Sequence, residues 1–245
     1  MKRADELDTL ARACRILEME GHGDLAQGHL SWRDPGGRSF WMKRNDIGLG
    51  EMLGPEDFVE LDFDGKQMSG SGRPHSEWPI HSEIFLARPD ITVVAHTHPL
   101  HACLMTGSTE DLQPYTLEAD KLKPIGRFAT SAALVNDKGM GRELAEALGQ
   151  GDVVFLANHG VAFCGATIAE AVCTGIFLER ACRVAVLAAS APLSWVLPSA
   201  ADRELRNRQM VTPGHIAQTW DYFIRKLEAL HTDANGRPKA VYGSR

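Results

Sequence analysis

The segment TVVAHTHPLHACLMTG, residues 92–107, places three histidines within six residues directly after an apolar run. The run predicts a buried strand, and His96 and His98 are two residues apart at its end. Because side chains two apart on a strand point to the same side, both imidazoles can reach one metal ion. His101 comes after Pro99, a residue typical of the first turn of a helix, so we expect His101 to lie outside the ligand set.

A third ligand must come from elsewhere in the chain, because a catalytic metal site typically has three protein ligands and one open position. His159 is the best candidate: the segment DVVFLANHG, residues 152–160, also ends a predicted strand, and Gly160 lets the backbone turn sharply. Two strands of one sheet that both end in histidine would bring all three imidazoles to the same edge. The alternative is that these are buried core histidines. A metal held by neutral imidazoles keeps its positive charge and polarises a carbonyl or carboxylate oxygen.

Glu77 is the candidate for proton transfer at such a site. It stands in RPHSEWPIH, residues 73–81, at the start of the predicted helix that leads into the strand of His96. A carboxylate near the ion can bind it, or act as an acid and base when substrate displaces it. The alternative is an ordinary first-turn glutamate that complements the helix dipole. Glu83, further along the same helix, is more typical of a surface or structural residue.

Apolar periodicity predicts the elements that must position these residues. Strands are expected at 29–33, 38–42, 57–66, 91–98, 152–160 and 160–165. Helices are expected at 5–20, 77–90 with Ser76 as cap, 99–107, 141–149, 168–190 with Thr167 as cap, and 214–230, whereas 110–138 is expected to be irregular. Hairpin turns join several strands, so the sheet should be antiparallel or mixed. No repeat or linker interrupts the pattern, which favours a single α/β domain over residues 1–245.

Composition argues against several classes of partner. The 245 residues carry a net charge of −6 with no basic stripe, which argues against nucleic acid. The first residues are charged and lack the apolar core of a signal peptide, and no apolar run approaches the roughly 20 residues that span a bilayer. Five cysteines without CxxC spacing disfavour a disulfide framework or a cysteine-bound metal. We therefore expect a cytoplasmic protein with a small-molecule substrate and without a nucleic-acid or membrane partner.

Three motifs together resemble the class II aldolase/adducin family: QGHLSWRD, SEWPIHSEIFLARPDITVVAHTHPLHA and LANHGVAFCGATIAEA. The resemblance extends over roughly residues 6–190 and follows the order of the family. It implies a single α/β/α domain with a central, mostly antiparallel sheet, here followed by a C-terminal helical extension over 191–245. It also implies a homo-oligomer, with a tetramer favoured, and one divalent ion per subunit, zinc or manganese, with cobalt possible. Carried over to this chain, the metal ligands are His96, His98 and His159, and the acid/base is Glu77.

Three departures from the family pattern bear on the substrate. Sugar-phosphate aldolases and epimerases of the family bind phosphate through an asparagine, a small Thr-Gly or Ser-Gly loop and a Ser-Ser pair. Here His29 replaces the asparagine, Lys43 and Arg44 begin the loop, and His75 replaces the first serine. Because a phosphate dianion needs several small donors converging on it, we expect a substrate without phosphate. Lys43 and Arg44 could instead bind a carboxylate, the alternative being solvated turn residues.

The candidate substrate-binding residues are therefore His29, Ser31, Lys43, Arg44, His75, Ser76 and His215. His215 opens the last predicted helix. In some members of the family a C-terminal histidine or tyrosine reaches a neighbouring subunit's site, and a helix cap is the alternative role for His215. Tyr115 lies in the region of the catalytic tyrosine of some sugar-phosphate aldolases, but out of register.

The function we expect is a metal-dependent carbon–carbon lyase, and specifically a decarboxylase of a non-phosphorylated hydroxy-aromatic or related carboxylate. Loss of carbon dioxide would leave electrons that a metal-bound oxygen stabilises as an enolate. Glu77, His29 or His75 would then protonate the resulting carbanion equivalent. Aldol cleavage follows the same enolate logic, and dehydration or epimerisation of a sugar derivative is the next enzyme hypothesis. A non-catalytic, adducin-like module belongs to a different class, and the complete histidine and glutamate set argues against it.

Overall fold

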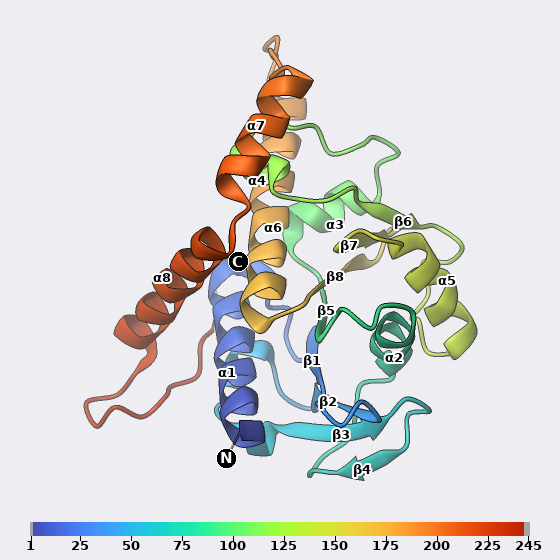
Figure 1. The fold of residues 1–245 in the computed structure, drawn as a ribbon, viewed down its shortest axis with the longest axis vertical. Helices are drawn as coiled ribbons and strands as arrows, with labels where there is room; N and C mark the ends of the chain where they lie inside the picture. The colour runs from blue at the N-terminus through green and yellow to red at the C-terminus, as the bar shows by residue number, and fades with distance from the viewer. Residues whose placement is uncertain (1, 243–245) are drawn as a thin grey trace.

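A sheet of eight strands runs through the part of the chain that the computed structural model describes, residues 2–242 (Figure 1). Its order is β4-β3-β2-β1-β5-β8-β7-β6, and each neighbouring pair is antiparallel except β6 and β7. This confirms the predicted, mostly antiparallel sheet. The strands are β1 His29–Arg33, β2 Ser39–Lys43, β3 Phe58–Asp62, β4 Gln67–Ser69, β5 Val93–Thr97, β6 Gly126–Phe128, β7 Val153–Leu156 and β8 Gly160–Gly165.

Helices cover both faces of the sheet, which confirms the α/β/α arrangement. One hydrophobic core lies between the sheet and α2 and α5, and a second lies between the sheet and α1, α3, α6 and α8. The helices are α1 Lys2–Leu17, α2 Trp78–Ala87, α3 Leu100–Thr106, α4 Leu117–Asp120, α5 Lys138–Leu148, α6 Ile168–Ser190, α7 Ala200–Met210 and α8 Pro213–His231. Within the described residues, none of these helices is both long enough and apolar enough to cross a membrane.

Alternation along the central strands decides which face each site residue joins. On β5, Val93 belongs to the core beneath α1 and α6, whereas Val94 belongs to the core beneath α2 and α5. His96 has the parity of Val94, so its side chain is directed toward the α2 side. The register places His29 of β1 directly opposite His96, and His29 therefore joins the same face.

The start of α2 differs from the prediction. The helix begins at Trp78, and Glu77 occupies its N-cap position without a side-chain cap bond, so the expectation that Ser76 caps this helix is wrong. Pro79 lies in the first turn, where its missing N–H has no intrahelical partner to lose. Ser76 is exposed, whereas Glu77 is buried. The shift by one residue turns Glu77 inward, toward the edge of the sheet.

The segments expected to be irregular contain more structure than predicted. Residues 110–138 contain α4 and the edge strand β6, which pairs parallel to β7. α7 was not predicted because AADRELRNRQM has no apolar stripe, and this helix buries none of its residues. Ion pairs hold it instead: the buried carboxylate of Asp120 binds Arg203 at 3.0 Å and also binds Arg206. α8 follows and is present as predicted.

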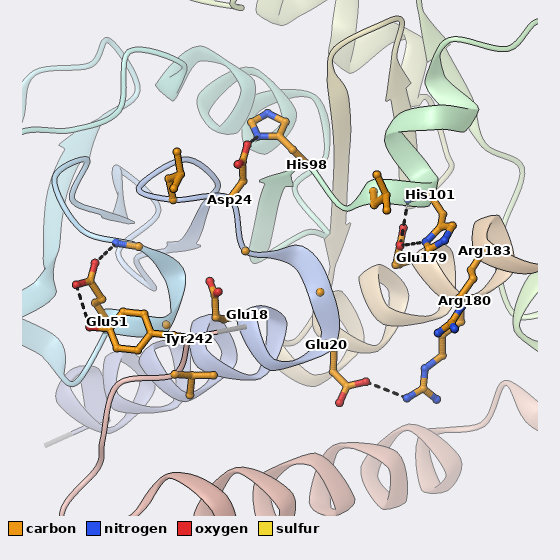
Figure 2. A pocket seen from close by; sticks show the side chains of 17 residues that line it. Glu18, Glu20, Asp24, Glu51, His98, His101, Glu179, Arg180, Arg183 and Tyr242 are labelled. Atoms are coloured by element: carbon orange, nitrogen blue, oxygen red, sulfur yellow. Dashed lines mark hydrogen bonds and ion pairs between the residues drawn. The ribbon is translucent and has the colours of Figure 1, made fainter. Parts of the chain in front are cut away.

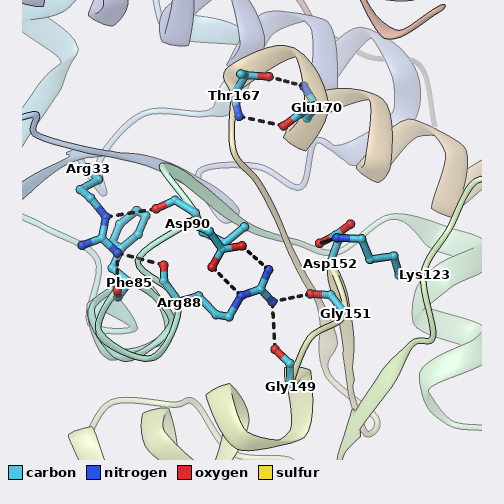
Figure 3. Close-up of polar contacts among 11 residues, drawn as sticks. Arg33, Phe85, Arg88, Asp90, Lys123, Gly149, Gly151, Asp152, Thr167 and Glu170 are labelled. Carbon is cyan, nitrogen blue, oxygen red and sulfur yellow. Dashed lines mark hydrogen bonds and ion pairs between the residues drawn. The ribbon is translucent and has the colours of Figure 1, made fainter. Parts of the chain in front are cut away.

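Two polar contacts anchor the ends of the long elements (Figure 3). Thr167 caps α6 as predicted: its hydroxyl accepts the Glu170 N–H at 3.1 Å, and the Glu170 carboxylate accepts the Thr167 N–H at 3.1 Å. At the end of α2, Arg88 donates to the carbonyls of Gly149 and Gly151, both at 2.9 Å. The same guanidinium forms a two-pronged ion pair with Asp90. This Arg88 clamp ties α2 to the turn between α5 and β7.

Replacing Arg88 by methionine should lower the free energy of unfolding by about 2–4 kcal/mol, because two backbone carbonyls lose their donors inside the protein. Urea denaturation measures the effect. Asp90→Asn is the matched control: the Asp90 side chain is 61% exposed, so the loss should stay below about 1 kcal/mol. Equal losses in the two variants would contradict the clamp.

Candidate metal centre

Three histidines from two neighbouring parts of the sheet meet at one edge. His96 lies in β5, His98 follows the end of that strand, and His159 lies in the turn between β7 and β8. β5 pairs with β8, so the three rings come together as predicted. His96 Nε2 and His98 Nε2 are 3.0 Å apart, and one nitrogen from each of the three rings lies within 4.8 Å of the others.

Hydrogen bonds on the far side of the rings determine which nitrogens face the centre. His96 Nδ1 lies 3.1 Å from the carbonyl of Val161, which can only accept, so the hydrogen is on Nδ1 and the lone pair is on Nε2. His98 Nδ1 faces the Asp24 carboxylate at 3.3 Å, which favours the same tautomer. Two lone pairs 3.0 Å apart repel each other unless a cation lies between them. Zinc–nitrogen distances of about 2.0–2.1 Å let both nitrogens reach one ion, so these residues fit a divalent metal.

Burial favours the neutral form of His96 and His98, as metal binding requires. Desolvation, reinforced by the neighbouring histidines, lowers the pKa of His96 well below its usual value. The pKa of His98 is also lowered, first by burial and then by His159, and Asp24 opposes the shift. Neutral rings offer their lone pairs without competition from a proton.

Glu77 lies against the same rings. Its Oε2 is 3.6 Å from His96 Nε2, and its Oε1 is 3.8 Å from His159 Nε2. Burial raises the pKa of Glu77, while the N–H of Val135, which donates to Oε1 at 2.9 Å, and the nearby His159 lower it. The carboxylate faces the histidines and does not cap α2, so the geometry favours the proton-transfer role over the helix-dipole role.

A second group of imidazoles lies beside Glu77. His29 Nε2 is 3.9 Å from Glu77 Oε2, and His29 Nδ1 is 2.6 Å from His81 Nε2. His75 packs on His29 with ring centroids 4.4 Å apart. Burial is the main cause that lowers the pKa of each ring, for His75 and His81 to about 3 and for His29 well below its usual value. Sequence reasoning missed His81, although its position four residues after Glu77 puts both on one face of α2.

His29, Glu77 and His96 form another group whose donor atoms lie within 4.8 Å of one another. It shares His96 with the three-histidine group. Because His96 Nδ1 is bonded to the Val161 carbonyl, this ring can bind one ion at a time, through Nε2. The two groups are therefore overlapping positions for a single ion.

Lys43 has neither of the roles expected of it, whereas substrate binding by Arg44 stays a prediction. Lys43 is fully buried, so it is not a solvated turn residue, and burial lowers its pKa to about 8. Its ammonium donates to three backbone carbonyls, those of Ala26 at 3.2 Å, Arg44 at 3.0 Å and Ile47. These bonds use all three hydrogens, so the carboxylate-binding role for Lys43 is not supported. The Arg44 guanidinium pairs with Asp46 at 3.0 Å.

The remaining predicted residues lie outside the centre or support it. Ser31 is buried, and its hydroxyl is 2.6 Å from His81 Nδ1. His215 does not cap α8, because Thr212 accepts its N–H; whether His215 reaches a neighbouring subunit stays a prediction. Tyr115 packs against Trp195 with ring centroids 5.9 Å apart.

His101 lies on α3, as expected, and bonds to a carboxylate. Its Nδ1 is 2.6 Å from Glu179, which also accepts the N–H groups of His101 and Ala102. Glu179 is buried, and its carboxylate satisfies these donors at the start of α3.

A cavity of about 940 Å³ opens beside the three-histidine group and touches it through His98 (Figure 2). The C-terminal segment forms part of its wall, where the Val241 N–H donates to the Gly50 carbonyl at 2.8 Å. A Cβ at Gly50 would lie 1.7 Å from the Val241 carbonyl oxygen, so this close approach requires glycine. Elsewhere in the wall Glu20 pairs with Arg180 at 2.9 Å. Of the three histidines, His98 alone lines this cavity, together with Asp24, which faces its Nδ1.

The sequence model of the class II aldolase and adducin N-terminal domain matches residues 8–186. The chain belongs to this family. A relative from Schizosaccharomyces pombe, the meiotically up-regulated gene 14 protein, is 26% identical over 194 residues, which cover 78% of this chain and 75% of the relative. The 3,4-dihydroxyphthalate decarboxylase of Arthrobacter keyseri is 26% identical over 201 residues, covering 73% of this chain and 77% of the enzyme.

A solved structure shows the same fold. The L-fuculose 1-phosphate aldolase of Glaciozyma antarctica PI12 superposes with a TM-score of 0.83 at 23% identity, covering 97% of this chain and 93% of the aldolase. The predicted class II aldolase fold is thereby confirmed. The chain is thus similar in sequence to a named decarboxylase and in fold to a named aldolase.

Removing one of the three imidazoles should abolish stoichiometric metal binding. We expect His96→Ala, His98→Ala and His159→Ala each to retain less than about half an equivalent of zinc or manganese after growth with metal supplied. Elemental analysis of the purified proteins measures this. His101→Ala is the matched control from the same segment and should keep the wild-type content. Full metal content in His96→Ala would contradict the assignment.

Proposed function

We propose that this chain is a divalent-metal-dependent carbon–carbon lyase that decarboxylates a non-phosphorylated hydroxy-aromatic or related carboxylate. The observation that carries the proposal is the convergence of neutral imidazole lone pairs on a buried carboxylate, with Glu77 Oε2 3.6 Å from His96 Nε2. His96, His98 and His159 would hold zinc, manganese or cobalt. When bound, the ion would supply a positive charge that polarises a substrate oxygen next to the scissile bond.

The residues around the ion have separate tasks. The Val161 carbonyl and the Asp24 carboxylate orient the rings of His96 and His98. Glu77 is the acid/base. Because Oε1 accepts the Val135 N–H, a proton on this carboxyl belongs on Oε2, the oxygen that faces His96. From there it can pass to the carbon that has lost carbon dioxide.

The surroundings favour a substrate without phosphate. His29 and His75, at the positions of phosphate donors in sugar-phosphate members, are neutral and buried, and the Lys43 ammonium is bound by carbonyls. A phosphate dianion requires donors or cations directed at it. The decarboxylase name of the Arthrobacter keyseri relative supports the same substrate class. Aldol cleavage would use the same residues, with an aldehyde as the leaving fragment.

We further infer a cytoplasmic homo-oligomer, with a tetramer favoured. The segment between α6 and α7 supports association, because Val196 is 97% exposed and Leu193 and Trp195 are exposed beside it. Light scattering on the purified protein measures the oligomeric state, and a monomer at micromolar concentration would refute this inference.

Glu77→Gln should lower kcat for decarboxylation by about 10²- to 10⁴-fold, because an amide cannot transfer the proton. Metal content should remain at the wild-type level. The assay measures carbon dioxide release from a panel of hydroxy-aromatic acids, alongside aldehyde release from a panel of aldols.

Glu83→Gln is the matched control, since Glu83 is another buried carboxylate on α2 that pairs with Lys138 at 3.5 Å, outside the centre. Its kcat should stay within about threefold of wild type. Activity confined to phosphorylated ketoses would overturn the substrate class, and full activity of Glu77→Gln would overturn the role of Glu77.

A further inference from the structure

A chain of short hydrogen bonds runs behind His29, away from Glu77. His29 Nδ1 is 2.6 Å from His81 Nε2, and His81 Nδ1 is 2.6 Å from Ser31 Oγ. All three side chains are buried, with His81 and Ser31 fully enclosed. Each contact joins two nitrogens, or a nitrogen and a hydroxyl, so the positions of the hydrogens decide which group donates and which accepts in each hydrogen bond.

The backbone carbonyl of Val94 determines that direction. It accepts a hydrogen bond from the Ser31 hydroxyl at 3.4 Å. Because the single hydrogen of Ser31 is directed to Val94, Ser31 Oγ accepts from His81, and His81 carries its hydrogen on Nδ1.

The position of the hydrogen on His81 then determines its position on His29. With its hydrogen on Nδ1, His81 presents a lone pair at Nε2, which accepts the hydrogen of His29 Nδ1. His29 therefore presents a lone pair at Nε2, the nitrogen that faces Glu77. The chain ends at a carbonyl that cannot pass a proton on, so it fixes a tautomer and does not conduct protons.

His75 offers a second nitrogen beside the first. Among the described residues its buried Nε2 has no hydrogen-bond partner, so it is free to bond a substrate group. The rings of His29 and His75 are 4.4 Å apart, so the acceptor of His29 and this unpartnered nitrogen occupy adjoining positions.

We propose that His81, backed by Ser31, is a positioning residue that fixes His29 as a hydrogen-bond acceptor, and that the site thereby selects a substrate carrying hydroxyl donors. A neighbouring pair of hydroxyls, as in a catechol-type carboxylate, matches the acceptor of His29 and the unpartnered nitrogen of His75. A phosphate or second carboxylate at this position would meet the lone pair of His29 and be repelled. The substrate class rests on the proposed function, whereas the tautomer does not.

Nitrogen-15 NMR of the zinc-loaded wild-type protein tests the tautomer directly, because imidazole nitrogens with and without hydrogen have distinct shifts and couplings. The His29 signals are assigned by their loss in His29→Asn. We expect hydrogen on Nδ1 and a bare Nε2. Hydrogen on His29 Nε2, or rapid exchange between the tautomers, would overturn the proposal.

Calorimetric titration tests the selectivity. Zinc-loaded wild-type protein should bind 3,4-dihydroxybenzoate at least about tenfold more tightly than 3-methoxy-4-hydroxybenzoate and 4-hydroxybenzoate, and inorganic phosphate should not compete. In His81→Phe this preference should fall below about threefold at unchanged zinc content. Ser82→Ala is the matched control: Ser82 is the next residue on α2, its buried hydroxyl contacts Pro79, and its preference should match wild type.

Competition by phosphate in the wild type, or an undiminished preference in His81→Phe, would overturn the proposal. Its failure can be told apart from failure of the decarboxylase function. If no hydroxy-aromatic acid releases carbon dioxide while the His29 tautomer and the hydroxyl preference hold, the decarboxylase proposal is lost and the acceptor role of His29 stands.

Discussion

The centre depends on the antiparallel register of three neighbouring strands, β1, β5 and β8. This register places His29 opposite His96, and His96 opposite Ala162. It also brings the Val161 carbonyl to the ring of His96. Because side chains alternate between faces, a slip of one residue would turn His96 toward α1 and α6, away from Glu77. The positions of His29 and His96 are thus set by the main-chain hydrogen bonds of the sheet.

Burial is the second constraint, and it converts a potentially cationic cluster into a neutral one. Six of the ten histidines gather around Glu77: His29, His75, His81, His96, His98 and His159. Charged rings would repel one another at these separations, and burial lowers the pKa of His29, His75, His81, His96 and His98. A carbonyl and a carboxylate take the hydrogens of His96 and His98, and the His81 ring takes that of His29. The lone pairs that remain face the interior, where they can bind an ion or a hydroxyl.

Much of this arrangement was predictable from local patterns, and what was not has physical reasons. The two-residue period of a strand was enough to group His96 with His98, and a second strand ending in His159 completed the group. Ser76 was expected to be the cap because it precedes an apolar helix, but the helix begins one residue later, with Glu77 at the N-cap and directed at the histidines. α7 could not be predicted because ion pairs, and no apolar stripe, attach it to the body.

The burial of Lys43 could not be predicted from the sequence for a different reason. A lysine beside a turn is normally solvated. Two of the carbonyls that enclose its ammonium lie in the turn that follows it, but the third, that of Ala26, comes from an earlier loop that only the folded chain brings close. The role of His81 could not be recognised for the same reason. Its partners lie on β1, about fifty residues earlier, and only the packing of α2 on the sheet brings them together.

The Arg88 clamp has a mechanical consequence that reaches beyond stability. α2 is a helix of ten residues that carries His81 and has Glu77 at its N-cap. Its other end is fixed by Arg88 to the turn between α5 and β7. Any rotation of α2 would displace Glu77 and His81 together. Loosening of the Arg88 clamp, which lies far from the ion, would therefore displace both residues at once. Heat or distant substitutions would then reduce turnover while the sheet and its metal ligands remain intact.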